Sequence, residues 1–249
     1  YEAAPVVATH LGFVQQPTDV ASGAAIAPAV TVQLLDASEN PVAEAGVSVS
    51  IPLSSGTGTL SGTTTQATDA AGLATFADLS LDLVGTKQLT ATAGELTEAV
   101  SANFDVTAGP AFEVVATSGS GQVTPVTTPF SQPLVATVYD AAGNVVPGAP
   151  VTFTAPASGA SGLFAGSGAT ATVTSNASGV ATAPTLTANG TAGTWSAGAT
   201  TPGAEGTASF ALTNLAADAQ VPVLGGVGRV ALSLLVAAAG AFLLSRFRG

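Results

Sequence analysis

Alternation of apolar and polar residues runs through most of the first 215 positions of the chain. Residues 30–34 read Val-Thr-Val-Gln-Leu, and residues 47–51 read Val-Ser-Val-Ser-Ile. Because successive side chains of a strand point to opposite faces of a sheet, a period of two predicts strands with one buried face. Clusters of Gly, Pro, Asn and Asp separate the runs, as they do in turns between strands. The pattern therefore predicts an all-β fold for this part of the chain.

One arrangement of runs occurs twice, with its two copies 104 residues apart. An apolar run leads to Asp36 and Asn40 and then to a second alternating run, and the same order recurs around Asp140 and Asn144. Two alternating runs separated by a cluster of Asp, Asn, Gly or Pro are typical of a β-hairpin. We therefore expect a hairpin in each copy, with the Asp–Asn cluster as its turn.

A second repeated motif agrees with this spacing. Residues 69–75 read Asp-Ala-Ala-Gly-Leu-Ala-Thr, and residues 176–182 read Asn-Ala-Ser-Gly-Val-Ala-Thr. The repeat unit of about one hundred residues is the size of one β-sandwich, and the seven to nine strands expected in the first copy fit an immunoglobulin-like sandwich. The sequence predicts a sandwich over residues 1–108, a second over 109–215, and a linker with a single C-terminal hydrophobic α-helix over 216–249.

Together these motifs resemble the bacterial immunoglobulin-like domains of invasin and intimin type, which occur in large surface adhesins. The resemblance covers residues 11–214 and includes a strand with a central Phe that closes each repeat, at Phe104 and Phe210. It implies extended, non-enzymatic rods on a bacterial cell surface. Modules of this kind recur both as spacers and as binders, so the resemblance is specific for fold and not for function.

Charge and cysteine content narrow the function classes. All 15 acidic residues lie before Gln220, and Lys87 is the single Lys or Arg in that part of the chain. The other basic residues, Arg229, Arg246 and Arg248, lie after Gln220. An acidic body without basic patches argues against nucleic acid as a partner, because phosphate contacts need Lys and Arg. The chain has no Cys, so packing alone must stabilise each sandwich. Residues 1–5 fit a mature N-terminus, and we expect an exported protein whose signal peptide has been removed.

The C-terminal segment combines an uncharged run with a basic end. At 1.5 Å per residue, residues 230–244 span about 22 Å as a helix, and extension back to Val221 reaches the roughly 30 Å of a bilayer core. The basic flank of Arg229, Arg246 and Arg248 would then keep the C-terminus in the cytoplasm. The residues expected to anchor or assemble this helix are Val230, Leu232, Leu234, Leu235, Val236, Phe242, Leu243 and Leu244.

The start of this segment resembles the C-terminal sorting tails of Gram-negative surface proteins. Val221, Pro222 and Leu224 match the Ile/Val-Pro-Thr-Leu-like motif that opens such tails, and Val223 stands where Thr is usual. The resemblance implies a sorting enzyme of the exosortase type as a partner. Residues 225–227 depart from the usual Ser-Glu-Trp, which leaves processing of the tail open.

Two hypotheses follow for the tail and for the whole chain. In the first, the helix inserts into a membrane and displays two sandwiches at the cell surface as a structural or adhesive protein. In the second, tails of many copies pack into the core of a homopolymeric extracellular filament, and the small residues 237–241 would allow that close approach. Both predict a homo-oligomer or a membrane partner, no cofactor and no catalysis.

Candidate sites for chemistry are few. Oxygen atoms of Asp36, Asn40, Asp140 and Asn144 could bind Ca²⁺, but Asx turns that cap their own backbone explain these residues more simply. His10 is the single histidine, so it is the one candidate for a catalytic imidazole base, and we expect no such role. Lys87 is expected on the surface with its aliphatic stem lying along the sandwich.

Overall fold

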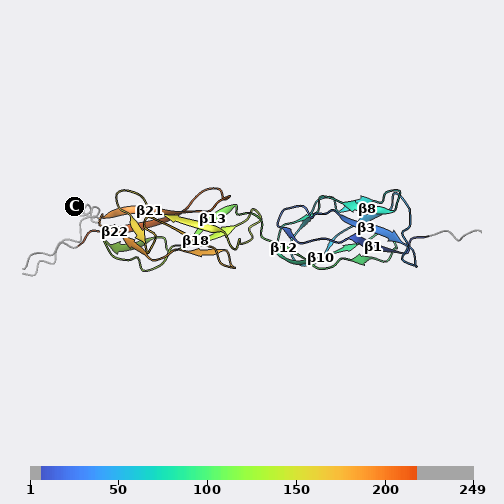
Figure 1. Ribbon diagram of the computed structural model, residues 1–249, viewed down its shortest axis with the longest axis horizontal. Coiled ribbons are helices and arrows are strands. Elements are labelled where there is room, and N and C mark those ends of the chain that lie inside the picture. Colours follow the sequence, from blue (N-terminus) through green and yellow to red (C-terminus); the bar gives the residue numbers. More distant parts are fainter. Residues whose placement is uncertain (1–6, 218–249) are drawn as a thin grey trace, which may run out of the picture. The chain divides into compact units, whose positions relative to one another are not determined.

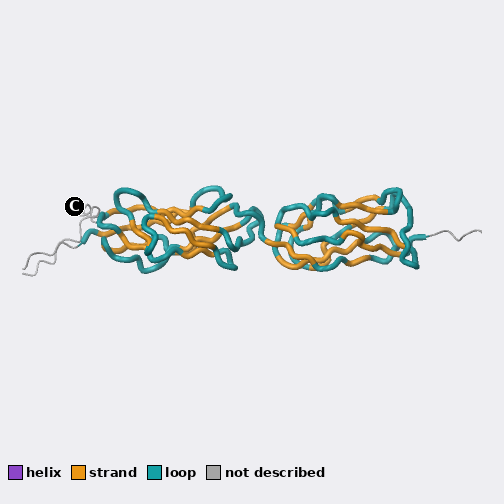
Figure 2. Tube along the Cα trace, in the orientation of Figure 1, coloured by secondary structure: helices purple, strands orange, loops and turns teal. Residues whose placement is uncertain are grey.

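The computed structural model describes residues 7–217, and the predicted tail helix, with its anchor, basic and sorting-like residues, lies outside them. The described part consists of strands and loops (Figure 2). It holds two immunoglobulin-like sandwiches, so the all-β prediction is confirmed. Within residues 7–217 we find no helix of the length and hydrophobicity that crossing a bilayer requires.

The first sandwich contains twelve short strands (Figure 1). They are β1 (His10–Gln15), β2 (Val20–Ala21), β3 (Val30–Leu35), β4 (Ser48–Ser50), β5 (Leu53–Ser55), β6 (Leu60–Ser61), β7 (Thr65–Ala67), β8 (Leu73–Phe76), β9 (Ser80–Leu81), β10 (Gly85–Ala91), β11 (Ala99–Val100) and β12 (Phe104–Thr107). One sheet has the order β1-β3-β8. The facing sheet has the order β11-β10-β12-β2, with β5 also paired to β10.

The second sandwich repeats this plan with ten strands. They are β13 (Glu113–Ser118), β14 (Gln122–Pro125), β15 (Val135–Tyr139), β16 (Pro150–Thr154), β17 (Gly162–Phe164), β18 (Thr170–Thr174), β19 (Val180–Thr182), β20 (Leu186–Ala188), β21 (Gly193–Thr200) and β22 (Ala208–Leu215). The sheets have the orders β13-β15-β19 and β14-β22-β21-β16-β18. In both sandwiches the second strand runs parallel to the last one, β2 to β12 and β14 to β22.

The expected hairpins do not form. β3 pairs with β1 and β8, whereas β4 pairs with β7 in the facing layer, and β15 and β16 are separated in the same way. The connection between β3 and β4 has twelve residues, which is longer than the two to five residues of most hairpin loops. The Asp–Asn cluster makes a local turn, and the chain then crosses from one sheet to the other.

Each sandwich has its own hydrophobic core. The first is built around Phe76 and Phe104 with apolar residues from Leu11 to Val106. In the second, Phe153 packs on Phe164 and Phe210 with ring centroids 6.3 and 5.9 Å apart. Burying such rings contributes about 2 kcal/mol or more each, which replaces the stabilisation that disulfides give to many secreted sandwiches.

Candidate functional site

The two Asp–Asn clusters form Asx turns of the same construction. Asp36 Oδ1 accepts hydrogen bonds from the backbone N–H groups of Ser38 and Asn40 at 2.8 and 2.9 Å. Asp140 Oδ1 accepts from the N–H groups of Ala142 and Asn144 at 3.0 and 2.8 Å. These carboxylates stabilise their own loops, which is the usual role of Asp at the start of a turn.

The calcium candidates do not gather further ligands. Asp36 and Asn40 belong to one turn, Asp140 and Asn144 to the other, and each carboxylate is already engaged by N–H groups. Within residues 7–217 no three acidic or His side chains come together as a metal cage. Calcium binding at these four residues stays an untested prediction.

The second turn differs from the first because it contacts the other sandwich. Asn144 is 7% exposed. Its Nδ2 donates to the carbonyl oxygen of Asp82 at 2.7 Å and to Ser22 Oγ at 3.1 Å. Its Oδ1 accepts from the backbone N–H of Val84 at 3.2 Å. One amide side chain therefore satisfies three groups at the end of the first sandwich.

The linker between the repeats is held by the same turn. The N–H of Gly109 donates to Asp140 Oδ2 at 2.9 Å, and Asn144 Nδ2 donates to that oxygen at the same distance. A Cβ at position 109 would lie 3.0 Å from the carbonyl oxygen of Ser22, so the close approach favours Gly there. These contacts define what we call the joint: Ser22, Asp82, Val84, Gly109, Asp140 and Asn144.

Hydrogen bonds set the charge of both turn carboxylates. Burial is the largest influence on Asp140 and opposes ionisation, but the bonds from Asn144, Gly109 and Ala142 outweigh it and hold the pKa of Asp140 below its usual value. For Asp36, the backbone N–H of Asn40 is the largest cause of a lowered pKa. Both groups are therefore ionised at neutral pH and act as acceptors only.

Lys87 is in the core and not on the surface, so that prediction is wrong. It is 1% exposed, its stem covers Gly56, and its Nζ donates to the carbonyl oxygen of Val84 at 3.1 Å. Trp195 occupies the corresponding place on β21, and its Nε1 donates to Asn214 Oδ1 at 2.8 Å. Lys87 thus fills an aromatic position of the other repeat and supports the loop that carries Val84.

His10 has two polar neighbours at the surface. Its Nδ1 lies 3.0 Å from Thr9 Oγ1 and its Nε2 lies 3.1 Å from Glu39 Oε2. This series of a hydroxyl, an imidazole and a carboxylate is exposed, and neither of the two grooves described below includes it. A triad accelerates acyl transfer only when it also meets a bound substrate and an oxyanion hole, and the absence of a catalytic role for His10 stays an untested prediction.

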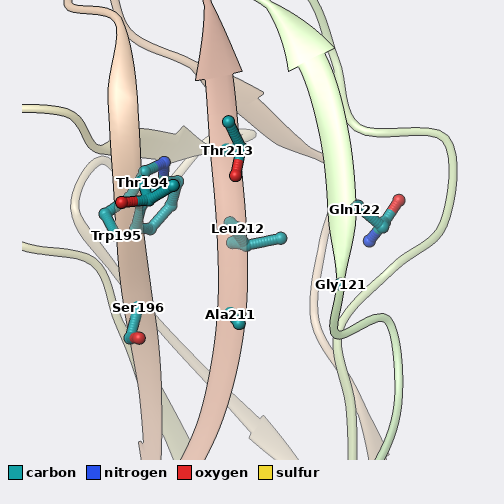
Figure 3. A pocket seen from close by; sticks show the side chains of 8 residues that line it. All are labelled: Gly121, Gln122, Thr194, Trp195, Ser196, Ala211, Leu212 and Thr213. Carbon is teal, nitrogen blue, oxygen red and sulfur yellow. The ribbon is translucent and has the colours of Figure 1, made fainter. Parts of the chain in front are cut away.

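A groove of about 360 Å³ runs along the outer side of the second sandwich (Figure 3). Thr194 and Ser196 on β21, Ala211 and Thr213 on β22 and Gln122 on β14 line it. The Trp195 ring is turned into the core and packs edge-to-face on Phe130. The groove therefore offers hydroxyl and amide groups without an aromatic platform. A second groove, of about 530 Å³, lies on the first sandwich between Ser50 and Thr92 and is lined mainly by Thr, Ser and Leu.

Comparisons with known proteins agree with the fold of the first repeat. A family profile described as SMCHD1 Ig-like domain 6 matches residues 5–107, less than half of the chain. No curated protein matches the sequence. The first repeat is therefore similar in sequence to an immunoglobulin-like domain, in agreement with its fold.

Solved structures with similar folds include bacterial surface proteins. Yersinia pseudotuberculosis InvD matches 83% of this chain at 20% identity with a TM-score of 0.43. Invasin, described as a bacterial integrin-binding protein, matches 83% at 20% identity with a TM-score of 0.36, and domains 4 and 5 of the S-layer protein SbsC match 85% at 14% with 0.35. The chain spans 58% of the InvD structure and 39% of invasin. Likeness at this level transfers no function to this chain.

Sequence reasoning identified both turns but missed what the second one contacts. Ser22, Asp82 and Val84 carry no local motif, and their role depends on being brought to one end of the first sandwich by two separate loops. Gly109 in the short linker was the one available signal, because a Gly where two domains meet indicates a close backbone approach.

Proposed function

We propose that the chain is an exported, non-enzymatic bacterial surface protein that displays tandem immunoglobulin-like sandwiches and is held by its C-terminal segment. The observation that carries the proposal is the contrast along the sequence between 15 acidic residues before Gln220 and the uncharged residues 230–244 with arginines beside them. The acidic part stays in water, whereas a run of this hydrophobicity is stable only when it is buried.

The joint supports a structural role for the described part. Asn144 and Asp140 tie the second sandwich and the linker to the first through hydrogen bonds that are shielded from solvent. Such hydrogen bonds favour a defined connection over a free tether between the modules, which suits a display protein. The two grooves described above are lined mainly by Thr, Ser, Ala and Leu residues.

The test follows the location of the full chain in a Gram-negative host. Replacing Leu234, Leu235, Leu243 and Leu244 by Ser makes the run polar, and we expect the protein to move from the membrane fraction to the soluble fraction. External protease should digest the sandwiches of the unchanged protein in intact cells. A soluble unchanged protein would contradict the proposal.

A matched variant separates anchoring from filament assembly. Replacing Ala237, Ala238 and Ala239 by Leu preserves hydrophobicity but blocks close helix packing. Under anchoring this variant remains in the membrane. If the tails form a filament core, it instead loses fibres seen by electron microscopy. Intact mass of the C-terminus reports whether a sorting enzyme cleaves near Val221, Pro222 and Leu224.

A further inference from the structure

The two Asx turns are equivalent in position as well as in construction. The N–H of Asp36 donates to the carbonyl of Asn40 at 3.0 Å, and Asp140 to Asn144 at 2.9 Å. The chain enters each sandwich beside its turn, because the N–H of Thr9 donates to the carbonyl of Leu35 and that of Phe112 to Tyr139, both at 2.8 Å. Thr9 and Phe112 are therefore corresponding residues.

The turns differ in what their Asn side chains contact. Both the Nδ2 and the Oδ1 of Asn144 form hydrogen bonds with the first sandwich. The Nδ2 of Asn40 contacts the carboxylate of its own Asp36 at 3.2 Å, and its Oδ1 accepts no hydrogen bond from residues 7–217. Asn40 is exposed, whereas Asn144 is buried. The first turn thus presents to solvent the amide that the second turn uses for docking.

We propose that the Asp36–Asn40 turn is a docking site for the end of another immunoglobulin-like sandwich, tethered ahead of Thr9 and built like the end of the first repeat. The Nδ2 of Asn40 would donate to a backbone carbonyl and a hydroxyl of the incoming sandwich, which correspond to the carbonyl of Asp82 and the hydroxyl of Ser22. The Oδ1 of Asn40 would accept from a backbone N–H that corresponds to that of Val84. The inference holds whether or not the C-terminal segment anchors the protein, and it replaces the expectation that residues 1–5 are a mature N-terminus.

The far end of the second sandwich does not fit this role. Leu81 and Ala188 are corresponding residues, because their carbonyls accept equivalent hydrogen bonds, from the N–H groups of Gly23 and Thr127. The next strand begins at Gly85 in the first sandwich and at Gly193 in the second, so the loop after β20 is one residue longer than the loop after β9. Asn189 stands where the first repeat has Asp82, and its carbonyl already accepts from Thr127 at 3.2 Å. A second copy of this chain is therefore a poor occupant of the Asp36–Asn40 turn. The end of its second sandwich does not fit, and the end of its first sandwich is already bound by its own Asn144.

A tether is needed because the joint is small. Three or four hydrogen bonds that replace bonds to water are too weak to hold two separate molecules together. A short linker raises the effective concentration to the millimolar range, where contacts of this strength are formed. The linker in this chain is Ala108–Ala111, and Gly109 in it donates to the turn.

The test extends the full chain with a copy of residues 7–111 ahead of Thr9, so that the native linker enters the first turn. The copy contains the whole first core, whose members lie between Leu11 and Val106. The chain has no Cys, so two introduced thiols react with each other alone. We expect a disulfide between Ser22→Cys of the copy and Ser38→Cys to close about as fast as that between Ser22→Cys and Ala142→Cys in the original chain, where residues 22 and 142 line one groove. Both pairs keep the amides of Asn40 and Asn144.

The matched control moves the second thiol to Glu39→Cys in the same turn. A Cβ at its counterpart Gly143 meets open space, so we expect closure at least tenfold slower. Equal rates for positions 38 and 39 would show a flexible tether and overturn the proposal. Disulfides between chains instead of within them would overturn the requirement for a tether.

Hydrogen exchange gives an independent measurement without thiols. The peptide containing Val84 occurs twice in the extended chain, and we expect two slowly exchanging Val84 amides. Asn40→Ala and Asn144→Ala should each leave one, and the double variant none. If Asn40→Ala leaves both amides slow, the proposal is wrong. Slow exchange at Leu89 in both copies verifies that the added sandwich is folded.

Discussion

Asp140 and Asn144 differ from Asp36 and Asn40 in burial and in partners, although the local hydrogen bonds of the two turns are the same. The local bonds follow from the residue types, since Asp at the first position of a turn accepts from N–H groups two and four residues later. The partners follow from the tertiary fold alone. Asn at the last position of the turn therefore has a local role in the first repeat, and in the second repeat it also binds the neighbouring sandwich.

Two glycines of the second repeat separate backbone strain from steric contact. Gly143 and Gly179 have φ of 84° and 71°, a region that costs an L residue about 1 kcal/mol. A Cβ at Gly143 meets open space, whereas at Gly179 it would lie 2.8 Å from Val145 Cβ and 3.0 Å from the carbonyl oxygen of Val138. We expect Gly143→Ala to lower the unfolding free energy by about 1 kcal/mol and Gly179→Ala by at least 1 kcal/mol more. Urea unfolding followed by fluorescence of Trp195, the single Trp, measures both; equal losses would contradict the steric argument.

Lys87 provides a second prediction about a single residue. Its stem is packed over Gly56 within the core, so Lys87→Ala removes three buried carbons and the ammonium group and should cost about 2 kcal/mol or more. Lys87→Met keeps the volume and loses the bond to Val84, and we expect a change of about 1 kcal/mol at most. Urea unfolding monitored by circular dichroism compares the two. If both variants change the unfolding free energy by less than about 0.5 kcal/mol, as expected for a surface lysine, Lys87 is not buried.

At the level of elements, Asn214 on β22 connects four parts of the second sandwich. Its Nδ2 donates to the carbonyl oxygens of Ser161 and Thr191 and to Asn189 Oδ1, and its Oδ1 accepts from Trp195. Because the residue is 1% exposed, its removal leaves several buried polar groups unpaired.

We therefore expect Asn214→Ala to lower the unfolding free energy of the second sandwich by about 3 kcal/mol. Asn176→Ala is the control, because Asn176 caps an exposed turn through the N–H groups of Ser178 and Val180 and should cost about 1 kcal/mol. Trp195 fluorescence during urea unfolding reports both values. If the two variants lose the same stability, the four connections do not act as a network.

The strands themselves follow well from the sequence, and their pairing does not. Alternation with period two located β3, β8 and β15 because their buried faces need apolar side chains. The expected hairpin failed because a local pattern cannot tell a tight turn within one sheet from a turn before a crossing to the other sheet. Asn214 and Ser22 escaped notice for the same reason, since their roles depend on contacts with residues 19 or more positions away.

Across the whole described molecule, ionised aspartates accept hydrogen bonds that hold loops in place. The pKa of Asp78 is lowered chiefly by the N–H of Thr63, and that of Asp82 chiefly by the N–H of Thr59. Both bonds fix the glycine-rich loop of residues 56–62 in the first sandwich. With Asp36 and Asp140, four carboxylates in the two repeats have a pKa below the usual value.

These shifts predict acid sensitivity with a definite sign. A carboxylate whose folded pKa is below its unfolded value of about 3.9 stabilises the fold above that pH, and the contribution is lost as the pH falls through the folded pKa. We expect the urea midpoint of the full chain to stay constant from about pH 7 to pH 5 and to fall steadily from about pH 4 to pH 2.

Asp78→Asn should lower the midpoint at pH 7 and flatten the decline in acid, because the side chain no longer titrates. Asn176→Ala, which removes a cap that does not titrate, is the control and should keep the acid decline. A midpoint that rises on acidification would show that repulsion among the acidic residues outweighs these hydrogen bonds.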